Sequence, residues 1–491
     1  MNSKILKRSK NLVYYKKINF TNSFVNPRLI NAEYSVRGTV AIKSGEYAEL
    51  LKKGEKLKFN KLYSLNIGNP QALDQKPITF PREVVSSLFD SRFGTPDSIN
   101  RSKTYLNEIK SVEHYTDYRG MKVVRDNIAQ FINERDDIDT VTSDNIILTN
   151  GAGGGIRLIL ETIVNNPKDS IMIPIPQYPL YTALISLFGC QQAPYYLDEE
   201  NGWSLDINDL HRSYKEQVDK GNTPKALVVI NPGNPTGNVL TKKNLMDIIK
   251  FCYDHHLIIL SDEVYQVNIY NPKKKFYSMR KVLETMSYPY RNTTVVSFHS
   301  TSKGVFGECG LRGGYLDMAN VPDEIVNLML KLKILDVCPN IAGQVVCDVM
   351  VKPPTLENAS SETVSLFNSE HNKLFENLKE KADILSKQLN NISRINSQRI
   401  DGAMYAFPKI DMPDFRIAEA EKLGIPADMN FCLKLLEHTG IVTVPGSGFG
   451  QKQGTHHFRL TNLINPKEEM VNMVEKMKSF CDDYFSKDSK I

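Results

Sequence analysis

The sequence lacks any apolar run of about 18 residues, the length that a membrane-spanning helix needs, so no membrane span is expected. Its seven cysteines form no CxxC pair and are odd in number, which favours free thiols in a reducing compartment over a disulfide framework. Its nine histidines include no HExxH motif, so no metal site is indicated.

A strong net charge is also missing, since the formal value is only +5 over 491 residues. Acidic and basic side chains are mixed along most of the chain, which is typical of a solvated surface and indicates no nucleic-acid partner. Only the beginning differs, because Asp and Glu are absent from residues 1–32. We expect residues 1–30 to form a basic arm in a cytoplasmic protein. The alternative is a mitochondrial transit peptide and a matrix location, because such peptides are basic and poor in acidic residues.

The composition is that of an ordinary folded protein, with 41% hydrophobic and 24% charged residues. From about residue 145, short apolar runs such as SIMIP, ALVVI, LIILS and TVVSF alternate with helical segments. This pattern predicts an α/β fold with a mainly parallel sheet that is covered by helices on both faces. We predict a large domain at 91–355 and a smaller α+β domain at 356–491, with residues 31–90 packing on the smaller one.

A single lysine, Lys303, follows the predicted strand TVVSF in a loop of serines and glycines. Ligands of parallel sheets bind at the carboxyl ends of the strands, so this loop is placed where a ligand binds. A desolvated lysine attacks carbonyl groups, and Ser300, Ser302 and Arg312 could hold a phosphate beside it. The combination indicates an aldehyde cofactor that carries a phosphate, namely pyridoxal 5'-phosphate. The alternative is a surface lysine in a flexible loop.

Two more strand-end loops offer groups for the same ligand. Asp262, in SDEVY, could keep a pyridine nitrogen protonated, although it could equally cap a helix. Tyr265 could donate to the cofactor phenolate. Asn234, in NPGNPTG, could donate its amide to the same oxygen, although such strings usually form simple turns.

The remaining loops fit this ligand as well. Tyr178, in PQYPLY, could stack on the cofactor ring or simply pack in the core. The segment GAGGGI, residues 151–156, opens a helix whose backbone N–H groups would attract phosphate. Because Ile156 breaks the GxGxxG pattern, a nicotinamide site is disfavoured.

These strings together resemble the class I aminotransferases, and within them the alanine aminotransferases. NPxNPTG, SDEVY, Ser-x-Ser-Lys and a late FR mark the class. The resemblance covers about residues 30–485. The longer motifs that carry it are NAEYSVRG (31–38), NIGNPQALDQKPITF (66–80), IPIPQYPLY (173–181), SFHSTSKGVFGECGLRGGY (297–315), GAMYAFP (402–408) and VPGSGFGQKQGTHHFRLT (444–461).

The resemblance implies a fold type I transferase that binds pyridoxal phosphate. In such an enzyme Lys303 would hold the cofactor covalently and move the proton at the substrate α-carbon. Asp262 would pair with the pyridine nitrogen, Tyr265 and Asn234 with the phenolate, and Tyr178 would stack on the ring. The implied phosphate contacts are the amides of Ala152 and Gly153, the side chains of Ser300, Ser302 and Arg312, and Tyr115.

Tyr115 matches a tyrosine that such enzymes contribute to the neighbouring subunit, so a homodimer is implied. Arg459, in HFRLT, would bind the substrate α-carboxylate, with Gly68 and Asn234 beside it. One position departs from the resemblance, because alanine aminotransferases usually read Gly-Ala-Ser where this chain has glycine at 153. One phosphate donor is therefore missing.

The implied reaction is L-alanine plus 2-oxoglutarate giving pyruvate plus L-glutamate, by a ping-pong exchange through pyridoxamine phosphate. Amino and oxo acids are thus the expected partners. The alternative enzyme is a glutamate–glyoxylate aminotransferase, because glyoxylate lacks only the methyl group of pyruvate. A non-catalytic interaction module that keeps the fold is a third possibility, but such a protein would be free to lose Lys303, Asp262 or Arg459, and all three are present.

Overall fold

The computed structural model describes residues 25–30 and 38–486, and an eight-stranded sheet lies at its centre. In spatial order the strands are β2 (Ile146–Asn150), β9 (Gly313–Ala319), β8 (Val295–Ser300), β7 (Ile258–Asp262), β6 (Thr223–Ile230), β3 (Asp169–Ile175), β4 (Gln191–Asp198) and β5 (Ser204–Leu205). Strands β4, β3, β6, β7 and β8 pair in parallel, whereas β9 is antiparallel to both β8 and β2. The predicted α/β fold with a mainly parallel sheet is confirmed.

Alternate residues of each central strand belong to different cores, as the two-residue period of a strand requires. In β3, Ile171 and Ile173 join one apolar cluster, while Met172 joins another on the opposite face. The first face is covered by α6 (Ala152–Ile163), α7 (Leu180–Phe188) and α11 (Asp323–Leu335). The second is covered by α8 (Ile207–Asp219), α9 (Lys242–Asp254) and α10 (Met279–Glu284). Burial on both faces explains why these strands read as continuous apolar runs.

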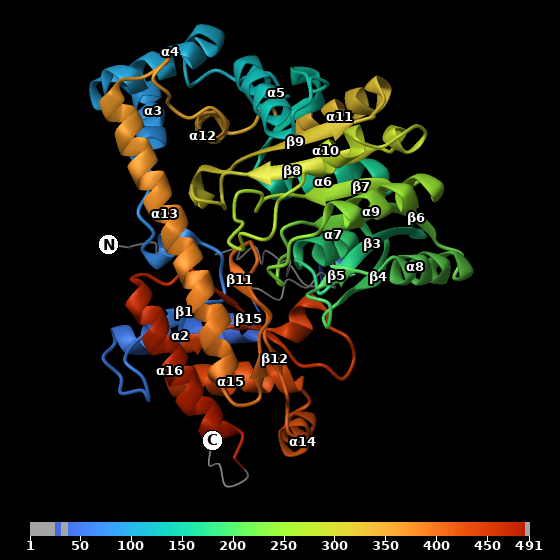
Figure 1. The fold of residues 1–491 in the computed structure, drawn as a ribbon, viewed down its shortest axis with the longest axis vertical. Helices are drawn as coiled ribbons and strands as arrows, with labels where there is room; N and C mark the ends of the chain where they lie inside the picture. The colour runs from blue at the N-terminus through green and yellow to red at the C-terminus, as the bar shows by residue number, and fades with distance from the viewer. Residues whose placement is uncertain (1–24, 31–37, 487–491) are drawn as a thin grey trace, which may run out of the picture.

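A third apolar cluster surrounds the β2 edge of the sheet and joins distant parts of the chain. Its helices are α3 (Thr79–Phe89), α4 (Pro96–Ile109), α5 (Lys122–Asp136) and α12 (Ile341–Val351). From there the long helix α13 (Ser361–Gln388) runs past the large sheet to the C-terminal part of the molecule (Figure 1).

The C-terminal part is a smaller α+β unit. Its helices are α14 (Asp414–Leu423), α15 (Ala427–Thr439) and α16 (Lys467–Tyr484), and its short strands are β10 (Ile395–Asn396), β11 (Tyr405–Ala406), β12 (Lys409–Ile410), β13 (Ile441–Val442), β14 (Val444–Pro445) and β15 (Phe458–Thr461). Strand β15 pairs antiparallel with both β11 and β14.

The N-terminal segments divide between the two parts. Helix α1 (Pro27–Ile30) contacts α7, and α2 (Thr39–Lys52) contacts α15. Strand β1 (Tyr63–Ser64) pairs in parallel with β13, whereas α3 packs against α4 and α12. The proposed domain boundaries stay a prediction. Most of the basic arm, residues 1–24, lies outside the described residues, so its role and the cellular compartment also stay predictions.

No described helix is both long and apolar enough to cross a membrane. All seven cysteines fall within the described residues, and all are free thiols.

The carboxyl end of β2 touches the amino end of β9 very closely. Here Gly314 faces Gly151, and a Cβ atom at position 314 would lie 2.6 Å from the Gly151 carbonyl carbon and 2.9 Å from the Ala152 nitrogen. Both atoms belong to the backbone where α6 begins. A glycine at 314 therefore sets the position of that helix relative to the sheet.

We expect Gly314→Ala to lower the thermal unfolding midpoint, because the two strands must separate to admit the methyl group. Forcing extra volume into a packed interior costs about 1–3 kcal/mol. Scanning calorimetry of the full chain measures the midpoint. Gly310→Ala is the matched control, since no described atom lies within 4 Å of a Cβ atom there. Equal losses in both variants would show that the close approach is not the cause.

Candidate active site

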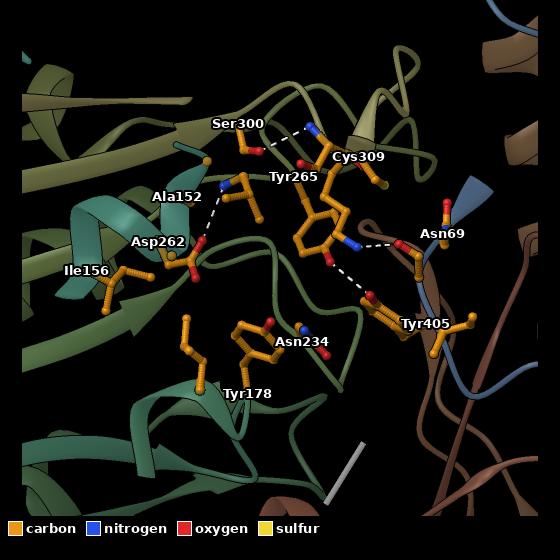
Figure 2. Close-up of a pocket in the computed structure, with 18 of the residues that line it drawn as sticks. Asn69, Ala152, Ile156, Tyr178, Asn234, Asp262, Tyr265, Ser300, Cys309 and Tyr405 are labelled. Carbon is orange, nitrogen blue, oxygen red and sulfur yellow. Dashed lines mark hydrogen bonds between the residues drawn. The ribbon is translucent and has the colours of Figure 1, made fainter. Parts of the chain in front are cut away.

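A cavity of about 650 Å³ opens at the carboxyl ends of the parallel strands, facing the C-terminal unit (Figure 2). It brings together every site residue that the sequence predicted except Tyr115. These residues are Gly68, Ala152, Gly153, Tyr178, Asn234, Asp262, Tyr265, Ser300, Ser302, Lys303, Arg312 and Arg459. Those not predicted as site residues are Ile67, Asn69, Gly151, Ile156, Leu180, Val264, Cys309 and Tyr405.

Lys303 lies in the loop after β8 and is half-buried. Its Nζ atom donates a hydrogen bond to the carbonyl oxygen of Gly68, which comes from the N-terminal segment. A Cβ atom at position 68 would overlap the hydroxyl of Tyr405 and would lie 2.9 Å from Lys303 Nζ. Glycine at 68 therefore keeps the space in front of the amine open.

Asp262 is the last residue of β7 and is only 4% exposed. Its carboxylate accepts hydrogen bonds from the Val264 amide at 3.4 Å and from the Tyr181 hydroxyl at 3.3 Å. Burial raises the pKa of Asp262 to about 6. Because neither donor carries a charge, the carboxylate is suited to accept a cationic N–H group from a ligand.

The other end of the cavity suits an anion. Helix α6 begins there at Ala152, after Gly151 in the positive-φ region (φ 75°), and the free N–H groups of a helix start attract negative charge. Arg312 lies beside this turn, with its Nη2 atom 2.8 Å from the Asn150 carbonyl oxygen. The buried Ser302 hydroxyl has no hydrogen-bond partner within the described part of the chain. An unsatisfied buried hydroxyl next to a guanidinium and a helix start fits a phosphate group.

Arg459, on β15, is the largest fully buried side chain near the cavity, with 2% exposure. Its Nη1 atom donates to Asn234 Oδ1 at 3.1 Å and its Nη2 atom to the Asn66 carbonyl oxygen at 2.7 Å. The guanidinium carbon lies 4.4 Å from the ring centre of Tyr405 and 4.7 Å from that of Phe449. A cation buried among uncharged partners favours binding of an anion such as a carboxylate.

Two tyrosines meet in the cavity wall. Tyr265 donates its hydroxyl proton to the Tyr405 hydroxyl at 3.0 Å (Figure 2). Burial raises the pKa of Tyr265 well above its usual value. Burial also opposes ionisation of Tyr405, but the positive charges of Lys303 and Arg459 outweigh it and hold the pKa of Tyr405 below its usual value.

The remaining predicted residues complete the cavity wall. Asn234 follows β6 and is buried, with its amide directed toward Arg459. Tyr178 follows β3 and is half-buried, and its ring lies beside Asn234 (Figure 2). Ser300 ends β8, and its hydroxyl donates to the Gly313 carbonyl oxygen at 3.2 Å.

Tyr115 lies elsewhere. It is 78% exposed in the loop after α4, outside the group of described residues that line the cavity. Cys309, which the sequence did not single out, does line the cavity, and its thiol donates to the Ser302 carbonyl oxygen at 3.0 Å. The missed Tyr405 stands inside GAMYAFP, where only its motif drew attention.

Comparisons with known proteins group this chain with one enzyme family. The family described as Aminotransferase class I and II matches residues 63–476. The chain is 41% identical to a probable mitochondrial alanine aminotransferase of Dictyostelium discoideum, over 97% of this chain and 91% of that protein. It is also 41% identical to glutamate–glyoxylate aminotransferase 2 of Arabidopsis thaliana, over 94% of this chain and 96% of that protein.

A solved structure supports the same grouping. The alanine aminotransferase of Pyrococcus furiosus superimposes with a TM-score of 0.74 at 26% identity, covering 93% of this chain and 99% of that one.

Asp262 gives a prediction about stability and pH. The pKa of Asp262 is about 6 in the folded protein, against 3.8 for an ordinary aspartate. The protonated carboxyl therefore contributes its full stabilisation below about pH 4, and this stabilisation is lost as the pH rises through 6. Without a ligand, we expect Asp262→Asn to stabilise the protein at pH 8, by about 1–3 kcal/mol. The advantage should disappear near pH 4, where both side chains are neutral. Urea unfolding between these pH values measures it.

Asp219→Asn is the control, because Asp219 is an exposed carboxylate paired with Lys215 at 2.6 Å. Removing that surface charge should change stability little at either pH. If Asp262→Asn gave no advantage at pH 8, the carboxylate would not be held in a water-poor site.

Proposed function

The chain belongs to the class I and II aminotransferases, and we propose that it interconverts L-alanine plus 2-oxoglutarate with pyruvate plus L-glutamate. One observation carries the proposal. A single cavity places a lysine, a buried carboxylate and a buried guanidinium together, namely Lys303, Asp262 and Arg459. An amine for proton transfer and a carboxylate clamp are what an amino-group exchange between small acids needs.

We infer that this cavity binds pyridoxal 5'-phosphate, the cofactor that the family uses. When bound, it would supply an electron-withdrawing ring that stabilises negative charge at the substrate α-carbon. Asp262 would accept the ring N–H, which would neutralise its buried charge. Asn234 and Tyr265 would hold the ring oxygen, and Tyr178 would stack on the ring. For the phosphate, Ser302 has a free buried hydroxyl, and the amides of Ala152 and Gly153 open α6, with Ser300 and Arg312 beside them.

Lys303 would hold the cofactor and would move the proton at the α-carbon. Its amine already faces the cavity and is directed by the Gly68 carbonyl oxygen. Gly68 leaves room for the substrate between this amine and Tyr405.

Arg459 would bind the α-carboxylate of each substrate in turn. A guanidinium offers two parallel donors that match a carboxylate, and its burial strengthens the interaction. The Asn234 amide oxygen fixes the orientation of its Nη1 atom. Since the amino donor and the oxo acceptor both carry an α-carboxylate, one clamp serves both halves of the exchange.

A second candidate function is glutamate–glyoxylate transamination. It is favoured by the Arabidopsis relative of that name, which is as similar to this chain as the Dictyostelium alanine enzyme, at 41% identity. Glyoxylate lacks the methyl group of pyruvate, and one methyl group is worth only about 1–3 kcal/mol of discrimination.

We also propose a homodimer in which Tyr115 reaches the phosphate site of the second copy. The support is the exposure of this aromatic side chain, 78%, next to the partly exposed Tyr118. An exposed pair of tyrosines on one loop is typical of a surface that a partner covers.

The substrate proposal is tested by comparing initial rates with pyruvate and with glyoxylate, using L-glutamate as the amino donor. We expect kcat/KM for pyruvate to be at least about tenfold higher, as one favourably packed methyl group allows. Lys303→Ala serves as the control and should lose turnover with both acids while remaining folded. A preference for glyoxylate would support the second candidate, and full turnover by the Lys303 variant would remove this lysine from the mechanism.

Position 153 gives a prediction about cofactor affinity. Gly153 lies within α6, and a Cβ atom there would meet a single described atom within 4 Å, Leu180 Cδ2, at an ordinary 3.5 Å. Serine therefore fits without strain and would add a hydroxyl at the proposed phosphate site. We expect Gly153→Ser to tighten cofactor binding about tenfold, because a hydrogen bond to a charged group contributes about 1.5–3 kcal/mol. Dialysis against cofactor-free buffer, followed by the remaining cofactor absorbance, measures the loss.

Gly154→Ser is the matched control. It changes the neighbouring helical glycine, where a Cβ atom also has room, at 3.7 Å from the Cβ atom of Thr149. Gly154 does not belong to the described residues that line the cavity. Both variants restrict the backbone equally, so equal retention of cofactor by the two would show that the added hydroxyl is not a phosphate donor.

A further inference from the structure

Tyr405 connects three residues of the proposed machinery, although no role has been given to it so far. It lies on β11, is 2% exposed and lines the cavity. Its hydroxyl accepts the proton of the Tyr265 hydroxyl at 3.0 Å, as the dashed line in Figure 2 marks. Its ring lies 4.4 Å from the guanidinium carbon of Arg459, and its hydroxyl borders Gly68.

The hydrogen bond between the two tyrosines raises a question of proton supply. A tyrosine hydroxyl carries one proton and can donate only one strong hydrogen bond. In the structure, Tyr265 gives that proton to Tyr405. Under the proposed function, on which this inference rests, Tyr265 must instead donate to the cofactor ring oxygen. Tyr265 can donate to the ring oxygen and keep its hydrogen bond with Tyr405 only if Tyr405 changes from acceptor to donor when the cofactor is bound.

We propose that Tyr405 is a positioning residue with two separate parts: its hydroxyl proton turns the Tyr265 hydroxyl toward the cofactor, and its ring holds the Arg459 guanidinium in place. The resulting chain runs from the Tyr405 hydroxyl to the Tyr265 hydroxyl and on to the ring oxygen. Hydrogen bonds in such a chain polarise one another, so Tyr265 becomes a stronger donor.

The charges around the two tyrosines set the pH range in which this chain of hydrogen bonds can form. Lys303, Arg459 and Cys309 act electrostatically on Tyr405 together with Tyr265 itself, and the charge of Asp262 acts on Tyr265. Burial opposes ionisation of both tyrosines, but the two cations hold the pKa of Tyr405 below its usual value, while that of Tyr265 is raised. Tyr405 therefore loses its proton first. A tyrosinate at 405 can only accept, so it would draw the Tyr265 proton away from the cofactor.

The role of the Tyr405 hydroxyl and the role of its ring can be separated by substitution. Tyr405→Phe removes the hydroxyl and keeps the ring, whereas Tyr405→Leu removes both. We expect Tyr405→Phe to lower kcat about tenfold with little change in KM, the effect of one lost hydrogen bond. Tyr405→Leu should also raise KM for the amino acid and the oxo acid, because the face that supports Arg459 is lost.

A double-substitution cycle shows whether Tyr405 acts through Tyr265. In a Tyr265→Phe background, adding Tyr405→Phe should cause no further loss of kcat, since the group it directs is already gone. Tyr270→Phe is the control. Tyr270 is an equally buried tyrosine whose hydroxyl accepts from Asn268 Nδ2 at 3.0 Å, and it is not one of the described residues around the cavity. This variant should keep the kcat and KM of the unsubstituted enzyme.

A spectroscopic titration tests the pair without turnover. Tyrosinate absorbance of the full-length chain, followed while pH is raised before cofactor is added, should contain one early ionisation that Tyr405→Phe lacks and Tyr270→Phe retains. Tyr265→Phe should move that ionisation to higher pH, because the hydrogen bond that stabilises the Tyr405 anion is lost.

The outcomes separate this proposal from the proposed function. A tenfold loss from Tyr405→Phe that persists undiminished in the Tyr265→Phe background would overturn the proposal, as would an unchanged titration in Tyr405→Phe. If the enzyme turned over glyoxylate or another oxo acid in place of pyruvate, the cycle would still be measured with that substrate. Loss of the early ionisation in Tyr405→Phe supports the tyrosine pair even if the substrate proposal fails.

Discussion

Two buried charges with uncharged partners dominate this structure. Arg459 contacts two amide oxygens and two aromatic rings, and Asp262 contacts an amide N–H and a hydroxyl. Removing either charge from water costs free energy that these contacts only partly offset, so the fold holds the site in a state that ligands of opposite charge stabilise. The raised pKa of Asp262, about 6, is the same cost expressed as a proton equilibrium. The surrounding architecture keeps both side chains in place despite this free-energy cost.

That architecture depends on close backbone approaches as much as on apolar packing. At Gly68 any side chain would overlap the Tyr405 hydroxyl, and at Gly314 it would meet the backbone that opens α6. At Gly68 the missing Cβ atom keeps the space in front of the Lys303 amine open, and at Gly314 it sets where α6 begins. The large sheet supplies a rigid platform for these contacts, because its central strands are buried on both faces by separate apolar cores.

The cavity is shared between the two parts of the molecule. Lys303 follows a strand of the large sheet but donates to Gly68 of the N-terminal segment, while Arg459 from the C-terminal unit donates to Asn234 of the large sheet. Tyr405 and Tyr265 repeat the pattern. Each of these three hydrogen bonds joins the large-sheet part to a segment that faces it. Some of the contacts that hold the two parts together therefore belong to the proposed site itself.

The sequence by itself determined the parallel sheet and most of the cavity wall, because both follow from patterns among residues that are close together in the sequence. Apolar runs mark buried strands, and polar residues at the ends of parallel strands, such as Asp262 after LIILS, must converge on one edge. Motifs placed Lys303 and Arg459 in the site as well. Only the tertiary structure decided that Tyr405 meets Tyr265 and that Tyr115 lies on the surface. It alone also showed that a side chain at position 153 has room beside Leu180. A two-residue strand such as β11 carries no periodicity, and contacts between residues 140 positions apart depend on how two folded parts pack, which no local pattern encodes.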